Sequence, residues 1–360
     1  MAKEFRRIGV LTSGGDAPGM NAALRAVTRA AIDKGVEVVA IYEGYKGLVH
    51  PQLKRFTSRD VSNIISRGGT SLYSNRCIEF KEEEGMQKAI QTCRENEIDG
   101  IVAIGGDGTF RGATDLSTRG IPTIGIPGTI DNDITSTEYS IGFDTAVNTA
   151  VEMIDRLRDT CESHARCNVV EIMGRNAGWV ALEAGIATGA SAIIIDEIKF
   201  DEDKVIADII EAKKNGKRNF IVCIAEGVPA NVGDKLYSEN FAKRFEEKTG
   251  IETKFVRLAH VLRGGDPTMR DRSIATQMGS MAVQLLLDGK SDLVVGMRDG
   301  KLVTTEIGYA LKLDRMYKGT LKEGDLDAFT KEQIAEMEAY CEKRREDMRK
   351  LYTVAYEMAH

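Results

Sequence analysis

Short apolar runs rich in β-branched residues alternate with amphipathic stretches along most of this 360-residue chain. The run Ile8–Thr12 predicts a strand, Asn21–Lys34 predicts a helix, and Val36–Tyr42 predicts the next strand. Further strands are predicted at Gly100–Ile104, Thr123–Ile126, Val169–Met173, Ala192–Ile195, Phe220–Ala225 and Leu293–Met297. Strands that alternate with helices form mainly parallel sheets flanked by helices. The pattern therefore predicts an α/β fold, and the length predicts two domains of roughly 100–200 residues each.

Glycine-containing motifs follow three of these strands directly. They are Ser13-Gly14-Gly15-Asp16, Gly105-Gly106-Asp107-Gly108-Thr109 and Pro127-Gly128-Thr129-Ile130-Asp131-Asn132-Asp133. In parallel sheets, ligands bind beyond the carboxyl ends of the strands, where helix N-termini favour phosphate groups. Taken alone, the first motif is also compatible with a tight strand-to-helix turn, and it is not a Walker motif because no Gly-Lys-Ser/Thr follows. Together the motifs predict a phosphate-binding edge.

The acidic residues of these motifs suit phosphoryl transfer. Asp107 stands among glycines at a strand end, where a carboxylate can hold Mg²⁺ beside phosphate oxygens. NAD kinases and diacylglycerol kinases carry a similar GGDGT, so this motif alone does not name the acceptor. Asp131 and Asp133 offer one group to accept an alcohol proton and another to orient the site. Cations that could hold the spreading negative charge follow at Arg166, Arg175 and Arg263.

Composition narrows the class of protein further. The net charge of −6 argues against a nucleic-acid-binding surface, so polyphosphate substrates need a local cluster of cations. The six cysteines are scattered without a C-x-x-C pair, as expected of a reduced cytosolic protein. The N-terminal residues lack the apolar core of a signal peptide, and no apolar run approaches the ~18 residues of a membrane span. We expect a cytoplasmic protein without membrane association.

The C-terminal segment predicts a long helix. Thr330 and Gln333 predict a capping box at its start. Apolar residues follow at heptad spacing, broken only by Arg344: Ile334, Met337, Cys341, Met348, Leu351, Ala355 and Met358. The favoured interpretation is a helix packed on its own domain, because fewer than four heptads are short for the alternative, an intermolecular coiled coil.

From Ile8 to about Asp314 the chain resembles the phosphofructokinase family. The resemblance is carried by GVLTSGGDAPGMNA, IGGDGT, PGTIDND, VEIMGR, AEG and RGGDP with T-x-x-DR, in the family's order and near its spacing. It implies a phosphotransferase that moves the γ-phosphoryl group of ATP, with Mg²⁺, to the 1-hydroxyl of fructose 6-phosphate. It further implies a larger ATP-binding domain (1–142 plus 262–312) and a smaller sugar-phosphate domain (143–261 plus 313–360). A sugar site shared between subunits implies a homodimer or homotetramer.

The resemblance also assigns roles to individual residues. ATP would contact Gly15, Arg76, Cys77, Gly106, Asp107, Gly108 and Thr109, with Asp107 holding Mg²⁺. Asp131 would be the catalytic base, assisted by Thr129 and Arg175. The sugar phosphate would contact Thr129, Ile130, Asp131, Met173, Gly174, Arg175, Glu226, His260, Val261, Leu262 and Arg263. A neighbouring subunit would add Arg166 and Lys254, the latter in place of the family's arginine. Without the motifs, Glu226 could be a solvated loop acid and His260 a structural histidine.

The choice of donor has its own signature. Pyrophosphate-using relatives carry Asp where Gly108 stands and Lys where Gly128 stands. Glycine at both positions favours ATP, because an added carboxylate would repel the α-phosphate. The segment Gly174–Trp179 and the long C-terminal helix instead resemble the mixed branch of the family, which holds both donor types. Pyrophosphate is therefore the alternative donor.

Regulation and two other functions stay open at this point. The effector site of allosteric bacterial members is matched only in part: Arg25, Arg29, Arg158 and Lys217 are in place, but a further lysine becomes Asn215. A kinase of another alcohol, such as NAD or a lipid, would share GGDGT but not TIDND and the sugar-phosphate arginines. A non-catalytic sensor would be expected to lack Asp107 or Asp131, and both are present.

Overall fold

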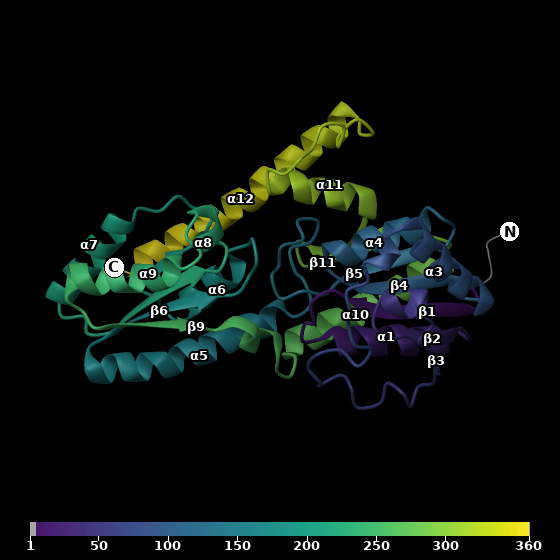
Figure 1. Ribbon diagram of the computed structural model, residues 1–360, viewed down its shortest axis with the longest axis horizontal. Helices are drawn as coiled ribbons and strands as arrows, with labels where there is room; N and C mark the ends of the chain where they lie inside the picture. The colour runs from purple at the N-terminus through teal and green to yellow at the C-terminus, as the bar shows by residue number, and fades with distance from the viewer. Residues whose placement is uncertain (1–4, 360) are drawn as a thin grey trace. The chain divides into compact units, whose positions relative to one another are not determined.

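The computed structural model describes residues 5–359 and divides them into two compact units (Figure 1). Unit 1 holds the chain up to Ile130, together with Ile134–Thr145 and Arg263–Glu338. Unit 2 holds Asp131–Asp133, Ala146–Leu262 and the chain from Ala339 onward. The chain thus passes between the units several times, without a low-complexity linker at any crossing.

Unit 1 is built on a seven-stranded sheet in the order β11-β10-β5-β4-β1-β2-β3. Its strands are β1 (Arg7–Ser13), β2 (Glu37–Ile41), β3 (Leu53–Phe56), β4 (Gly100–Gly105), β5 (Thr123–Pro127), β10 (Leu293–Arg298) and β11 (Lys301–Glu306). The central strands are parallel, and only the edge strands β3 and β11 pair in the antiparallel sense. Apolar residues fill β1, β4 and β5, as expected of strands buried on both faces.

Helices cover both faces of this sheet. They are α1 (Met20–Asp33), α2 (Lys46–Val49), α3 (Glu83–Glu95), α4 (Asp107–Ser117), α10 (Met269–Leu287) and α11 (Ile307–Tyr317), with a 3₁₀ turn at Glu79–Lys81. Helices α1 and α10 pack together on one face, and α4 packs on the other with α11 beside it (Figure 1). Residues 313–338, which the resemblance assigns to the smaller domain, cluster with unit 1, because α11 contacts α4 and the neighbouring strands.

Unit 2 is built on a four-stranded, all-parallel sheet in the order β7-β8-β6-β9. Its strands are β6 (Cys167–Ile172), β7 (Ala192–Ile194), β8 (Phe220–Ala225) and β9 (Thr253–Arg257). Its helices are α6 (Trp179–Ala187), α7 (Glu202–Lys214), α8 (Val228–Asn231) and α9 (Tyr237–Thr249), followed by a 3₁₀ turn at Ala259–Arg263. Helix α5 (Phe143–His164) begins in unit 1 and continues in unit 2. The predicted α/β class with mainly parallel sheets is confirmed.

The C-terminal helix α12 (Lys331–Ala359) begins with the predicted capping box. The Thr330 backbone N–H donates to Gln333 Oε1 at 2.9 Å, and the Gln333 N–H donates to Thr330 Oγ1 at 3.3 Å. Met337, Cys341 and Met348 are buried against the same chain, but α12 extends from unit 1 (to Glu338) into unit 2 (from Ala339) and does not belong to one domain alone. Arg344, which interrupts the apolar pattern, is also buried, with its guanidinium 4.9 Å from the ring centre of Trp179. The interruption is therefore a cation–π contact within the chain.

Candidate active site

The strand order of unit 1 brings the three glycine motifs to one edge of the sheet. Strands β5, β4 and β1 are neighbours, and the order reverses between β4 and β1 because β2 lies on the far side of β1. Such a reversal is where open α/β sheets bind ligands. Hydrogen bonds join the motifs: the Gly128 N–H donates to the Gly105 carbonyl at 3.0 Å, and Thr109 Oγ1 donates to the Ser13 carbonyl at 3.0 Å.

The second motif combines tight packing with open space. A Cβ on Gly105 would lie 2.3 Å from the Ser13 carbonyl oxygen, so packing alone requires glycine there. A Cβ on Gly106 or Gly108 would meet no atom within 4 Å. Gly106 caps the N-terminus of α4 and Asp107 opens its first turn, where the helix dipole favours anions. The motif thus leaves open space beside the backbone of Gly106 and Gly108, which a ligand can enter.

The first motif lies beside Arg263. The Arg263 Nη1 atom donates to the Asp16 carbonyl at 3.2 Å, and a Cβ on Gly15 would lie 2.6 Å from that nitrogen. The structure therefore places Arg263, expected at the sugar phosphate, next to the first glycine loop of unit 1. His260, expected to act with it, belongs to unit 2.

The segment that carries Arg76 and Cys77 is tied to the first motif. Ser74 Oγ donates to the Gly14 carbonyl at 2.5 Å. Arg76 is exposed, whereas Cys77 packs against the core cluster that includes Phe80. The side chain of Arg76 is therefore accessible, and that of Cys77 serves packing.

The third motif is buried where the chain passes from one unit to the other. Thr129 and Ile130 belong to unit 1, and the Thr129 carbonyl accepts from Ser140 Oγ at 2.7 Å. Asp131 and Asp133 cluster with unit 2, and their exposed fractions are only 4% and 9%. Burial of a carboxylate is costly unless polar groups compensate it, and both aspartates interact with their surroundings.

The two glycines linked to donor choice differ in their surroundings. Gly108 faces open space, as described above. A Cβ on Gly128 would lie 3.1 Å from Met20 Cε and 3.2 Å from Ile104 Cγ2. An aspartate therefore fits at position 108, whereas a lysine at position 128 requires its neighbours to shift.

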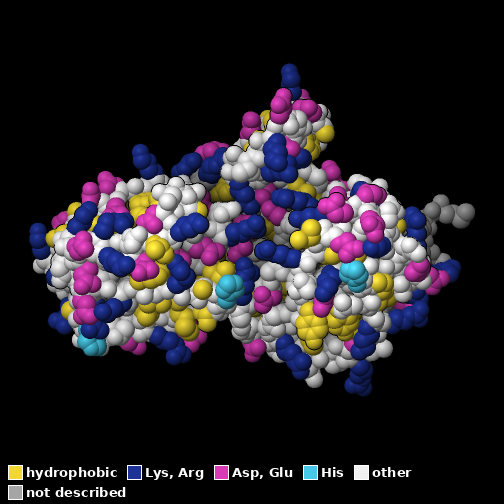
Figure 2. Space-filling model, viewed as in Figure 1, with side chains coloured by type: hydrophobic (Ala, Val, Ile, Leu, Met, Phe, Trp, Pro, Cys, Tyr) yellow, Lys and Arg dark blue, Asp and Glu magenta, His cyan; other side chains and the backbone are white. Residues whose placement is uncertain are grey.

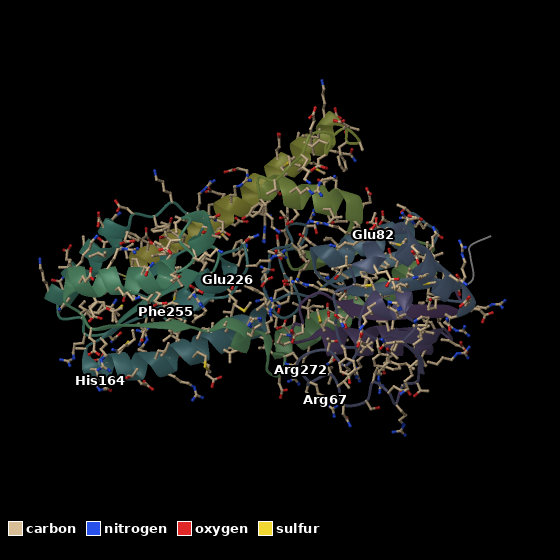
Figure 3. All side chains as sticks on the ribbon, viewed as in Figure 1. Arg67, Glu82, His164, Glu226, Phe255 and Arg272 are labelled. Atoms are coloured by element: carbon tan, nitrogen blue, oxygen red, sulfur yellow. The ribbon has the colours of Figure 1, made fainter. Side chains whose placement is uncertain are left out.

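In unit 2, Glu226 supports the loop after β6. Its Oε1 atom accepts from the backbone N–H groups of Gly174 (3.1 Å) and Arg175 (2.6 Å) (Glu226 is labelled in Figure 3). Arg175 adopts a left-handed conformation with φ of 57°, which is unfavourable for a residue with a side chain. The carboxylate of Glu226 compensates this strain, so Glu226 is not a solvated loop acid.

A hollow opens beside Glu226. It is lined by Glu171, Met173, Glu226, Pro229, Lys235, Arg257, Ala259 and His260. The sequence predictions include Met173, Glu226 and His260, and the structure brings these three together. They missed Glu171 and Arg257, which bond each other at 2.5 Å between Oε1 and Nε. The position of Glu171 within VEIMGR and the cationic end of β9 were the available signals.

Arg166 and Lys254 lie at the other end of the unit 2 sheet. Both bond Glu252: Arg166 Nε is 2.7 Å from Oε2, and Lys254 Nζ is 3.0 Å from Oε1. The six-residue strand β6 separates Arg166 from Met173. Such a strand spans about 20 Å. Within one chain, these two cations therefore cannot reach a sugar phosphate bound beside Glu226.

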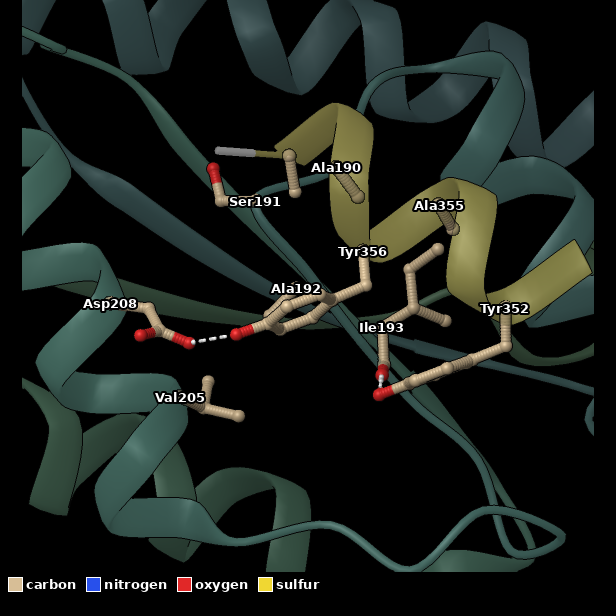
Figure 4. Close-up of a pocket in the computed structure, with 10 residues that line it drawn as sticks. Ala190, Ser191, Ala192, Ile193, Val205, Asp208, Tyr352, Ala355 and Tyr356 are labelled. Atoms are coloured by element: carbon tan, nitrogen blue, oxygen red, sulfur yellow. Dashed lines mark hydrogen bonds between the residues drawn. The ribbon is translucent and has the colours of Figure 1, made fainter. Parts of the chain in front are cut away.

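A second, smaller hollow in unit 2 lies beneath the end of α12 (Figure 4). Tyr356 donates to Asp208 Oδ2 and Tyr352 to the Ile193 carbonyl, each at 3.1 Å. Nearby, Lys217 Nζ donates to the Ala359 carbonyl at 3.3 Å, and burial together with the charge of Arg158 lowers the lysine pKa. Of the expected effector-site residues, the structure thus brings Lys217 and Arg158 together under α12. Arg25 and Arg29 lie on α1 of unit 1.

The side chains that could hold a metal ion at this site are few. Among residues 5–359, no cluster of three or more His, Cys, Asp or Glu side chains could by itself hold a metal ion. Mg²⁺ commonly takes one or two carboxylates and completes its shell with substrate phosphates and water. Asp107, at the edge of the open space beside Gly106 and Gly108, fits that requirement.

None of the described helices is long and apolar enough to cross a membrane.

Lysine and arginine side chains alternate with acidic ones over the face shown in Figure 2, without an extended basic surface.

The site defines a phosphate-binding α/β protein of the phosphotransferase class. It combines glycine motifs at a sheet switch point, a carboxylate at a helix N-terminus and a hollow lined by charged groups. Comparison with known proteins gives the family. The family model described as phosphofructokinase matches residues 7–286, and the chain belongs to the phosphofructokinase family.

Two relatives illustrate the similarity. The chain is 49% identical over 319 residues to ATP-dependent 6-phosphofructokinase 1 of Clostridium perfringens, covering 89% of this chain and 98% of the relative. It is 50% identical over the same length to ATP-dependent 6-phosphofructokinase of Clostridium tetani. Among solved structures, Pichia pastoris phosphofructokinase in the T-state matches 99% of this chain with a TM-score of 0.84 and 33% identity. The chain spans only 39% of that longer protein.

Proposed function

We propose that this protein is an ATP-dependent 6-phosphofructokinase, which converts ATP and fructose 6-phosphate to ADP and fructose 1,6-bisphosphate. The observation that carries the proposal is the joining of the three glycine motifs at the β5-β4-β1 edge, with Asp107 at the N-terminus of α4. The relatives in two clostridia, similar over nearly their whole length, carry that activity in their names.

The donor binds at the glycine motifs of unit 1. Backbone N–H groups around Gly15, Gly106 and Gly108 face the polyphosphate, whose charge the α4 dipole also favours. Asp107 would hold Mg²⁺, which when bound neutralises charge on the transferring phosphoryl group. Thr109 positions this turn through its bond to the Ser13 carbonyl.

The acceptor reaction rests on the third motif and the loop after β6. Asp131 accepts the proton of the 1-hydroxyl as it attacks the γ-phosphorus, and Thr129 lies two residues before it. The Glu226 carboxylate holds the backbone of Arg175 in a left-handed conformation, and the exposed side chain of Arg175 is then available to the phosphoryl group. A preorganised cation stabilises the negative charge that spreads over the phosphoryl oxygens.

The sugar phosphate occupies the hollow beside Glu226 and His260. Arg166 and Lys254 serve the corresponding hollow of a second copy of the chain, since β6 separates them from their own. The proposal therefore includes a homo-oligomer with shared sugar sites.

Initial rates with alternative substrates test the function. The purified protein should phosphorylate fructose 6-phosphate with ATP and show little activity with pyrophosphate as donor. NAD and diacylglycerol should not be phosphorylated. Preference for pyrophosphate would overturn the donor but keep the acceptor, whereas phosphorylation of NAD or lipid alone would overturn the whole proposal.

A further inference from the structure

Lys318 is a cation that the topology of unit 1 delivers to the glycine-motif edge. Strand β10 runs toward this edge, the antiparallel β11 runs back, and α11 then returns the chain to the edge. Lys318 follows α11 directly as its C-terminal cap. Its position beside α4 is thus a consequence of the β10–β11 hairpin.

The side chain of Lys318 is fixed between two carboxylates. Its Nζ atom lies 2.8 Å from Asp314 Oδ2 and 3.7 Å from Asp107 Oδ2. Asp314 is anchored in turn, because its Oδ1 accepts from Thr135 Oγ1 at 2.8 Å and from the Thr135 N–H at 3.3 Å. The exposed fractions of the side chains are 20% for Lys318, 15% for Asp107 and 6% for Asp314.

This degree of burial argues against a simple surface ion pair. Removing charged groups from water is costly, and a pair at four-residue spacing on a helix stabilises only weakly. The distance of 3.7 Å from Asp107 exceeds a hydrogen bond, so the ammonium acts on that carboxylate through its charge. A fixed ammonium at this point lies within reach of any anion bound at the Gly106–Thr109 turn.

The charge of the donor favours cations near the turn. The chain has a net charge of −6, so the overall field opposes a polyphosphate and binding depends on local cations. The glycine motifs supply backbone N–H groups but no formal positive charge. A compact ammonium is well suited to phosphate oxygens.

We propose that Lys318 is a donor-binding residue whose ammonium contacts the phosphates of the nucleotide at the Gly106–Thr109 turn. Asp314 and Thr135 are positioning residues that hold it there. The proposal rests on the proposed function, because it takes the donor to bind at this turn. It extends that function to a residue outside the motifs that carry the resemblance to the family.

The test compares Lys318→Met with Lys312→Met. Lys312 lies on the same helix and pairs with Asp325 at 2.6 Å, so its variant controls for loss of a lysine from α11. Equilibrium dialysis with radiolabelled ATP and Mg²⁺ gives the Kd, and initial rates give the KM of each substrate. We expect Lys318→Met to raise the Kd and KM for ATP about 10- to 100-fold, the loss of one charge-assisted hydrogen bond. The KM for fructose 6-phosphate should stay within about twofold.

Conservative variants separate binding from capping. Lys318→Arg keeps the charge and should recover part of the ATP affinity, while Lys318→Gln keeps the polar head and should not. A role limited to capping α11 would lower the melting temperature and leave the ATP affinity unchanged. Lys318→Gln also serves as the test if the methionine variant does not fold.

The outcomes separate the two proposals. Wild-type ATP affinity in folded Lys318→Met or Lys318→Gln, or an equal rise in the KM of both substrates, overturns the assignment of Lys318 alone. Failure of the wild type to bind ATP overturns this assignment and the proposed function together. Loss of ATP affinity in the Lys312→Met control would show a general effect of α11 and also overturn the assignment.

Discussion

Units 1 and 2 both carry parallel sheets with functional groups at the carboxyl edge, but they use different chemistry. In unit 1 the edge is formed by glycine motifs, and Gly106 and Gly108 leave space that no side chain fills. In unit 2 the hollow is lined by ionisable side chains, including Glu226, Arg257 and His260. Backbone N–H groups suit the many equivalent oxygens of a polyphosphate, whereas a sugar phosphate presents hydroxyls at fixed positions.

This difference predicts opposite sensitivities. In unit 1, activity should fall most when a side chain is added at a glycine, because the added atoms fill the space that the ligand needs. In unit 2, activity should fall most when a side chain is removed, because each side chain supplies a contact that the backbone cannot replace. Substitutions in the third motif, at which the chain passes between the units, should lower turnover more than substitutions in either unit.

The largest effect is expected for Asp131→Asn. Turnover should fall about 10²- to 10⁴-fold, the contribution of a general base, because the amide cannot accept the proton of the 1-hydroxyl. Steady-state kinetics measure the turnover. Ligand-induced thermal shifts should show that fructose 6-phosphate still binds. Near-normal turnover of the purified variant would remove Asp131 from this role.

Gly108→Asp tests the prediction for unit 1. Like charges ~4 Å apart cost on the order of 4 kcal/mol at an effective dielectric near 20, so kcat/KM with ATP should fall about 10³-fold. The variant should fold, because a Cβ at this position meets no atom within 4 Å and the first turn of a helix favours an acid.

Gly108→Asn is the matched control for the aspartate variant. It has the same size without the charge, and its loss of kcat/KM with ATP should be much smaller. Any residual activity of Gly108→Asp should shift toward pyrophosphate. Gly128→Lys, added to complete the switch, is expected to cost stability because Met20 and Ile104 crowd that position. Unchanged ATP kinetics in Gly108→Asp would contradict the donor assignment.

Arg166→Ala tests the prediction for unit 2. Loss of a charge-assisted phosphate contact should raise the KM for fructose 6-phosphate about 10- to 100-fold, with a much smaller change for ATP. When Arg166→Ala and Asp131→Asn chains are mixed, hybrid oligomers should regain activity, because one site type then contains both intact residues. No recovery in demonstrated hybrids would argue against a site shared between chains.

The smallest effect concerns the stability of unit 2 and its dependence on pH. Hydrogen bonds from Arg244, at 2.9 Å and 2.7 Å, lower the pKa of Glu202. A lowered folded-state pKa stabilises the protein above the unfolded pKa, near 4.3, and this stabilisation is lost as the pH falls through the folded value. Glu202→Gln should therefore reduce the free energy of unfolding at pH 7 by at most about 1 kcal/mol. The difference from the wild type should shrink toward zero on acidification.

Trp179, the single tryptophan of the chain, lies in α6 of unit 2 and reports on this unit alone. Urea unfolding followed by its fluorescence at pH 7 and pH 3.5 measures the difference. Glu37→Gln removes a comparable arginine partner in unit 1, where Arg7 lowers the Glu37 pKa, and serves as the control. An equal Glu202→Gln effect at both pH values would contradict the role of ionisation.

Much of the fold could be predicted from local sequence. The predicted strand Phe220–Ala225 matches β8 to the residue, and the predictions for β1, β4 and β5 differ by one residue at most at either end. A strand buried on both faces must be a continuous apolar run, and a glycine or a charged residue at its end, such as Glu226 after β8, ends the run. These two requirements are local, so a single sequence contains them.

Three edge strands of the described sheets were not predicted, whereas the edge strand β7 was predicted as Ala192–Ile195. The strands β3, β9 and β11 carry lysine or arginine among apolar residues, because one side or one face of each meets solvent. One signal was available: Asp299-Gly300 forms the turn between β10 and β11 with φ values of 48° and 70°, as Asp-Gly does in two-residue hairpins.

The sequence by itself determined the kind of chemistry at most strand ends, since the glycines, Asp107, Asp131, Glu226 and most of the arginines were identified from their motifs. Only the tertiary structure decided which of them meet. It placed the Glu226 carboxylate at the backbone N–H of Arg175, the Arg263 guanidinium beside Gly15, and the Lys318 ammonium beside Asp107. These contacts depend on strand order and on the direction in which α11 returns to the sheet. Strand order and helix direction follow from burial summed over the whole unit, so no local stretch of sequence can specify them.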